Sequence, residues 1–135
     1  MRPLILLVWI AGLVQLGIAA ANVWVPGKVN ARENLARVSP MTRSIFVVHW
    51  GYIVFVLVIF SLLCFFFAPE LASGTALGRF LSGSMAVFWL ARVVIQLCYY
   101  DAAVRRQNRL ADVAFLLAVL YLGSVFTAAA LGWFV

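Results

Sequence analysis

Four long apolar runs are the feature that most constrains how this chain can fold. Residues 3–23, 44–68, 75–100 and 113–135 are almost free of charge, and about 20 such residues suffice for a helix to cross a bilayer. Charged residues make up only 10% of the 135 residues, against about 25% in a soluble domain. The sequence therefore predicts an all-α integral membrane protein, with one transmembrane domain over residues 1–135 built as a four-helix bundle. It lacks the alternating strands of a membrane barrel.

The positive charges predict how the helices are oriented. The loops at about residues 24–43 and 101–112 hold seven basic residues, while the opposite side holds only Arg2 and Arg79. Short loops rich in Lys and Arg remain in the cytoplasm, so we expect both termini outside, in a bacterial inner membrane. The seven residues expected at the inner face are Lys28, Arg32, Arg37, Arg43, Arg105, Arg106 and Arg109.

These basic residues also indicate which partners to expect. The isoelectric point is about 10.2, which in a soluble protein would suggest nucleic acid. Each Lys or Arg near an anionic leaflet gains about 1 kcal/mol from attraction to the lipid. Membrane topology and anionic lipid on the cytoplasmic side therefore account for the charge, and no nucleic-acid partner is expected.

The first apolar run has a second interpretation, a cleavable signal peptide. Arg2, the apolar residues from Leu4, and the alanines at positions 19–21 follow the order of such a leader. Cleavage would leave three spans and place both basic loops outside, against the charge distribution. We therefore expect the first helix to be retained.

Several local signals refine this topology. Ser39 and Pro40 are typical of a helix N-cap followed by a first-turn proline, and residues 29–38 could form a short surface helix. Cys64 and Cys98 are expected on opposite sides of a hydrocarbon core about 30 Å thick. A disulfide needs Cα atoms within about 7 Å, so we expect both cysteines to be unpaired.

Small residues recur every four positions on the last two predicted helices. Such residues let helix backbones approach closely in lipid, and the two series match in depth when the helices are antiparallel. The expected pairs are Gly78 with Gly132, Ser82 with Ala128 and Ala86 with Ser124. Homodimerisation through one of these seams is the alternative.

Polar residues inside the spans are the candidates for a functional site. Groups of this kind are costly in lipid and usually face the bundle interior. A rise of about 1.5 Å per residue places Gln15, His49, Arg92 and Gln96 in the cytoplasmic half of the membrane. The predicted ligand-binding cluster consists of Arg92, Gln96, His49, Gln15, Tyr99, Tyr52 and Tyr121.

Arg92 poses the sharpest question within this cluster. Its guanidinium stays protonated, and the nearest carboxylates, Asp101 and Asp112, are expected to lie too far away to neutralise it. Either Arg92 extends its side chain to the inner interface, or an anionic lipid headgroup or a partner's carboxylate pairs with it. In a third interpretation, these polar residues only bond to backbone carbonyls and fix the helix register.

Enzymatic chemistry has little support in the sequence. A single histidine excludes haem held by two histidines, and a zinc site needs three or four protein ligands, so neither a metal nor a cofactor is predicted. Paired carboxylates within the spans and a glycine-rich phosphate loop are also missing.

The leading hypothesis is accordingly a non-enzymatic accessory or scaffold subunit of a larger membrane complex. The alternative is a binding or enzymatic site for an amphiphile with an anionic head, such as a lipid, an isoprenoid or a quinone-like molecule, with Arg92 as counter-charge. Transport of a small solute is the third hypothesis, and it lacks the internal repeats common in transporters.

Overall fold

Four membrane-length helices dominate the structure, a computed structural model that describes residues 3–28, 31–100 and 102–132. They are α1 (Pro3–Lys28), α3 (Pro40–Phe66), α5 (Ala76–Cys98) and α7 (Arg109–Leu131). Three short helices connect them: α2 (Ala31–Leu35), α4 (Ala68–Leu71) and α6 (Ala102–Gln107). The predicted all-α class and the four spans are confirmed, since all four long helices have the length and apolar composition needed to cross a membrane.

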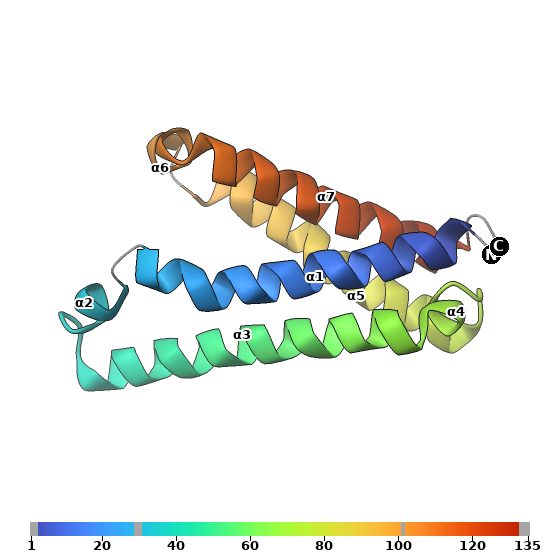
Figure 1. The fold of residues 1–135 in the computed structure, drawn as a ribbon, viewed down its shortest axis with the longest axis horizontal. Coiled ribbons are helices and arrows are strands. Elements are labelled where there is room, and N and C mark those ends of the chain that lie inside the picture. Colours follow the sequence, from blue (N-terminus) through green and yellow to red (C-terminus); the bar gives the residue numbers. More distant parts are fainter. Residues whose placement is uncertain (1–2, 29–30, 101, 133–135) are drawn as a thin grey trace.

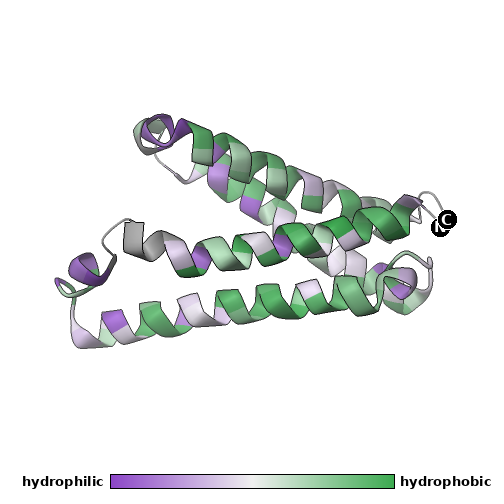
Figure 2. Cartoon of the chain, viewed as in Figure 1, coloured by the Kyte–Doolittle hydropathy of each residue, from purple (hydrophilic) through white to green (hydrophobic). Residues whose placement is uncertain are grey.

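The long helices form two antiparallel hairpins, α1 with α3 and α5 with α7, which meet where α1 packs on α7. Figure 1 shows that the hairpins come together at the end that holds α4 and both chain ends, and diverge towards α2 and α6. The hydrophilic residues gather mainly at the diverging end, on α2 and α6 (Figure 2). We call these the α4 end and the basic end.

Capping residues explain where the helices begin and end. The Ser39 hydroxyl accepts a hydrogen bond from the Thr42 backbone N–H, and Pro40 occupies the first turn of α3, as predicted. Thr75 caps α5 in the same way through the backbone N–H of Gly78. Helix α7 ends at Leu131 and is capped by Gly132, whose left-handed backbone (φ 74°) favours glycine.

The buried core lies mainly where the two hairpins meet. Its largest members include Phe126, Leu57, Met85 and Leu122, drawn from α7, α3 and α5. Helix α1 contributes Val8 and other fully buried residues, so the first helix is an integral part of the packed bundle. Helix α3 is the exception. Only 11% of its 18-residue apolar stretch is buried inside the protein, against 39% for the corresponding stretches of α1 and α7.

Contacts of the small residues differ from the predicted pairs. Gly78 and Ser82 face the short connection α4: a Cβ on Gly78 would collide with the Glu70 carbonyl, and the Ser82 hydroxyl donates to the Leu71 carbonyl over 3.0 Å. Ser124 is exposed. Matched depth predicts which residues of two helices lie at the same height in the membrane. It does not show which face each helix turns towards the other.

Other small residues form the contact between α5 and α7. Gly123 accommodates the Leu90 side chain, because a Cβ there would lie 2.6 Å from the Leu90 Cδ2 atom, and Gly83 lies opposite Ala130. Ala86 and Ala128 are buried, Ala128 in a cluster with Leu4 of α1. Gly132 lies beside Arg79 rather than Gly78. The cysteines are unpaired as expected, with Cys64 buried and Cys98 exposed.

Candidate functional site

The predicted polar cluster is divided among separate places in the structure. One group connects the two hairpins, a second connects α5 to α6 and α7, and the remaining residues lie exposed. Every buried side-chain nitrogen and oxygen in the described residues has a hydrogen-bond partner. The question for each residue is therefore which partner it has.

Gln15 is completely buried and joins three helices. Its side-chain nitrogen donates to the Ala11 carbonyl and to the Cys64 sulfur, each at 3.3 Å, and its oxygen accepts from the Trp89 indole at 3.1 Å. Cys64 lies two residues before the end of α3, towards the α4 end. Gln15 thus bonds to α3 and α5, and the structure does not bring it to Arg92.

Tyr121 forms a second link between the hairpins. Its hydroxyl donates to the backbone carbonyl of Leu7 over 2.8 Å, so α7 is bonded directly to α1. The indole of Trp89 packs edge-on against Phe88, with ring centroids 5.1 Å apart. These contacts lie where the two hairpins meet.

A charged network connects α5, α6 and α7 near the basic end. The Arg92 guanidinium donates to the Gln96 side-chain oxygen over 3.0 Å, and the Gln96 amide donates to the Asp112 carboxylate. Arg105 binds both oxygens of Asp112, at 3.0 and 3.2 Å. Asp112 also lies in the first turn of α7, where a helix stabilises negative charge. The hydrogen bond that Arg105 donates to Asp112 raises the pKa of Arg105 above its ordinary value.

Two aromatic rings lie close to the charge of Arg92. The guanidinium carbon lies 4.7 Å from the centroid of the Phe115 ring and 5.1 Å from that of Tyr100. Both distances are within the range of a cation–π interaction. Arg92 therefore has partners inside its own hairpin, and Gln96 connects it indirectly to the carboxylate that seemed too remote.

Sequence reasoning did not identify Asp112 as part of this network. The distance along α5 makes Asp112 seem distant from Arg92, but an antiparallel hairpin brings together residues that are equally far from its turn. Gln96 and Asp112 are each eight positions from residue 104, within the connection between the helices. Counting from the turn would have predicted this contact.

His49 lies exposed on α3, away from Arg92. Its Nδ1 atom is 2.7 Å from the Ile45 carbonyl oxygen. A carbonyl only accepts, so Nδ1 carries the hydrogen, and Nε2 of a neutral ring is left as an acceptor. Thr42, Ile45, Phe46 and His49 line a shallow hollow of about 360 Å³, and we call these four residues the α3 flank.

Helical phase shows which way the α3 flank points. Phe60 follows Phe46 by fourteen residues and His49 by eleven, so the three share one side of the helix. The Phe60 ring contacts Phe88 of α5, with centroids 5.2 Å apart. The side of α3 that meets α5 near the α4 end therefore carries His49 at the basic end, where the hairpins diverge (Figure 1).

The two remaining tyrosines lie outside both hydrogen-bonded groups. Tyr52 is 63% exposed and packs edge-on against Phe55, and Tyr99 is 83% exposed beside Tyr100. The partners of Arg92 and Gln96 described above include neither of these tyrosines. Within the described ranges, no three His, Cys, Asp or Glu side chains could hold a metal ion together.

The predicted basic residues lie at the basic end, in the connections or in the adjoining ends of the long helices. Arg43 donates to the Leu35 and Val38 carbonyls and so closes the end of α2. Arg105 binds Asp112, as described above, whereas Arg32, Arg37, Arg106 and Arg109 are exposed. Lys28 is the last residue of α1, and its side chain lies outside the described residues.

Comparisons with protein-family models, curated proteins and solved structures found no match to this chain.

Proposed function

We propose that this membrane protein is a non-enzymatic accessory or scaffold subunit, and that its α3 flank binds a transmembrane helix of a partner protein. The position of His49 carries the proposal. It lies nine residues into α3, about 13 Å along the helix axis, yet its ring is exposed. Ionisable residues within membrane spans almost always face other helices or a water-filled cavity. An exposed His49 on the side of α3 that faces the opening between the hairpins therefore favours a covering helix.

The chemistry of the flank specifies what such a partner would provide. With Nδ1 bonded to Ile45, a neutral imidazole offers Nε2 as an acceptor, which a hydroxyl or amide donor on the partner would satisfy. Side-chain hydrogen bonds between membrane helices contribute about 0.6 to 2 kcal/mol. Phe46 and Ile45 would supply the apolar contact around this bond.

The α5–α7 hairpin supports a different part of the proposal. Arg92 already bonds to Gln96 and contacts two aromatic rings, so this hairpin offers a stabilised structure rather than an unpaired charge. This arrangement favours a scaffold over the alternative in which Arg92 is the counter-charge of a bound amphiphile. The proposal retains a bacterial inner-membrane location with the basic loops in the cytoplasm, which the charge distribution supports.

Site-specific photocrosslinking tests the proposal in membranes of the native cells. A benzophenone amino acid replaces Phe46 in the flank or, as a matched control, Phe55. Phe55 lies on the opposite side of the same helix and is also exposed. We expect one defined protein adduct from position 46, none from position 55, and loss of the adduct on His49→Leu. Equal labelling from both positions, or lipid adducts alone from position 46, would contradict the proposal.

A further inference from the structure

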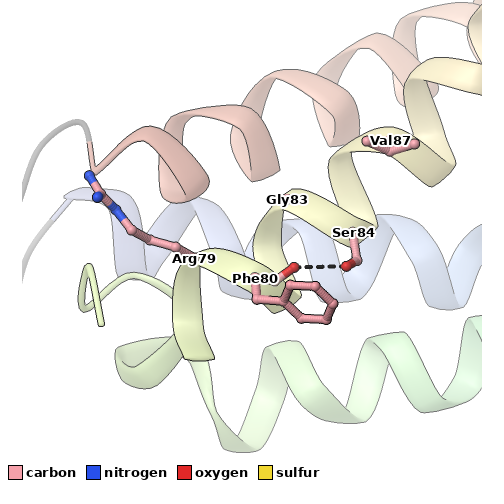
Figure 3. A pocket seen from close by; sticks show the side chains of 5 residues that line it. All are labelled: Arg79, Phe80, Gly83, Ser84 and Val87. Carbon is pink, nitrogen blue, oxygen red and sulfur yellow. Dashed lines mark hydrogen bonds between the residues drawn. The ribbon is translucent and has the colours of Figure 1, made fainter. Parts of the chain in front are cut away.

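We propose that α5 carries a phospholipid-binding groove at the α4 end, in which Arg79 pairs with the phosphate and one acyl chain lies along the helix. The groove has a volume of about 590 Å³ and is lined by Arg79, Phe80, Gly83, Ser84 and Val87. Figure 3 shows these residues along α5, with Arg79 reaching towards the end of α7. This groove is separate from the α3 flank.

Arg79 is held in place at the mouth of the groove. One guanidinium nitrogen donates to the Leu131 carbonyl over 3.1 Å, at the end of α7 where the helix dipole attracts a positive charge. A guanidinium has five N–H donors, so this bond fixes the group and leaves further donors for an anion. The ion pair found in the described residues joins Arg105 to Asp112 and does not involve Arg79.

The remaining walls suit a hydrocarbon chain. Gly83 and Ser84 form a low floor between the exposed side chains of Phe80 and Val87. The Ser84 hydroxyl donates to the Phe80 carbonyl over 2.8 Å, the bond drawn in Figure 3, so its hydrogen is already used. From Arg79 to Val87 the helix rises about 12 Å, which gives an apolar path from the membrane surface towards its centre.

The order of these features identifies the occupant as an amphiphile. Arg79 lies within the first turn of α5, at the depth where lipid phosphates meet a spanning helix, and the apolar part of the groove lies deeper. A phospholipid has the same order, with an anionic phosphate above a hydrocarbon chain. Charge complementarity at one end and apolar contact along the rest therefore favour a phospholipid of the leaflet on the side of the chain ends.

Photolabelling in nanodiscs tests this groove with a probe that reports position. The probe is phosphatidylglycerol with a diazirine on its acyl chain, and labelled peptides are mapped by mass spectrometry. Arg79→Gln removes the charge, and Gly83→Leu fills the floor, where a new Cβ would meet Ala130 no closer than 3.7 Å. Arg106→Gln removes an exposed charge at the basic end as the control.

We expect label concentrated on residues 80–87, reduced at least fivefold in both groove variants and unchanged in the control. Uniform labelling of all lipid-facing helices would overturn the proposal, as would a loss in Arg79→Gln without a loss in Gly83→Leu. A crosslinked dimer through residues 80–87 would also overturn it, since a second protein chain would then occupy the groove. Circular dichroism of each variant shows whether the helices are retained.

Discussion

The two hairpins satisfy their polar groups in different ways. In the α5–α7 hairpin, Arg92, Gln96, Asp112 and Arg105 form one continuous network inside the hairpin. In the α1–α3 hairpin, Gln15 bonds across to Trp89 of α5, while His49 has one bond within its own helix and its ring is exposed. The difference shows that a polar residue inside the membrane indicates a partner protein only when its own chain leaves one of its polar atoms without a hydrogen bond.

The same contrast appears between the two ends of the bundle. At the α4 end, the Ser82 hydroxyl bonds to the Leu71 carbonyl of α4, and Arg79 bonds to the Leu131 carbonyl at the end of α7. Helix α5 is therefore bonded both to the connection α4 and to α7. At the basic end, each hairpin is stabilised internally and the two diverge (Figure 1). We therefore expect the substitution with the largest effect on stability to lie where the hairpins meet.

Trp89→Ala is expected to have the largest effect on stability. Trp89 is almost completely buried, and its loss removes the contact with Phe88 and leaves the Gln15 oxygen without its donor. Truncation of a buried tryptophan costs about 3 to 5 kcal/mol. Unfolding in mixed micelles measures the change, and Trp9→Ala at an exposed position of α1 is the control. Equal losses in both variants would contradict the role given to this contact.

Arg92→Lys is expected to have an intermediate effect. Lysine keeps the charge but lacks the planar group that contacts Phe115 and Tyr100. Cation–π contacts are worth about 0.5 to 2 kcal/mol. The free energy of unfolding should fall for Arg92→Lys and stay unchanged for Arg106→Lys, which alters an exposed arginine. If Arg92→Lys left stability unchanged, the two rings would not brace the guanidinium.

Tyr121→Phe is expected to have the smallest effect of the three. It deletes only the hydroxyl that bonds α7 to the Leu7 carbonyl, and a single hydrogen bond contributes about 0.5 to 1.5 kcal/mol. Tyr52→Phe is a matched control, because Tyr52 is exposed and contacts Phe55 through its ring, which phenylalanine retains. A loss that is as large in the control would remove Tyr121 from the list of links between the hairpins.

Much of the fold could be predicted from the sequence because the bilayer imposes simple requirements. The length of each apolar run defined the spans, and Ser39 with Pro40 marked the start of α3 within a residue of the observed helix. The short helix α2 was expected from residues 29–38, and it occupies residues 31–35. These features depend on local chemistry, and local chemistry is what a single sequence contains.

The candidate site could be predicted only in part, because its residues belong to different neighbours. Helical periodicity groups Arg92 with Gln96, and they do bond to each other. It cannot show that Gln15 turns towards Trp89, or that His49 lies exposed on the side of α3 that faces α5. Packing between hairpins decides those directions, as it decides that Gly78 and Ser82 contact α4 rather than α7.

The central claim is that the hairpins meet at the α4 end and separate at the basic end, which leaves the α3 flank uncovered. Double electron–electron resonance measures the distance between spin labels on α3 and α5 and so tests it directly. The protein is placed in nanodiscs, with Cys64 and Cys98 replaced. One pair joins the exposed positions Leu62 and Leu77 near the α4 end, and the other joins Val47 and Leu97 near the basic end. We predict a clearly longer mean distance for the second pair; equal distances, or a shorter one at the basic end, would contradict the claim.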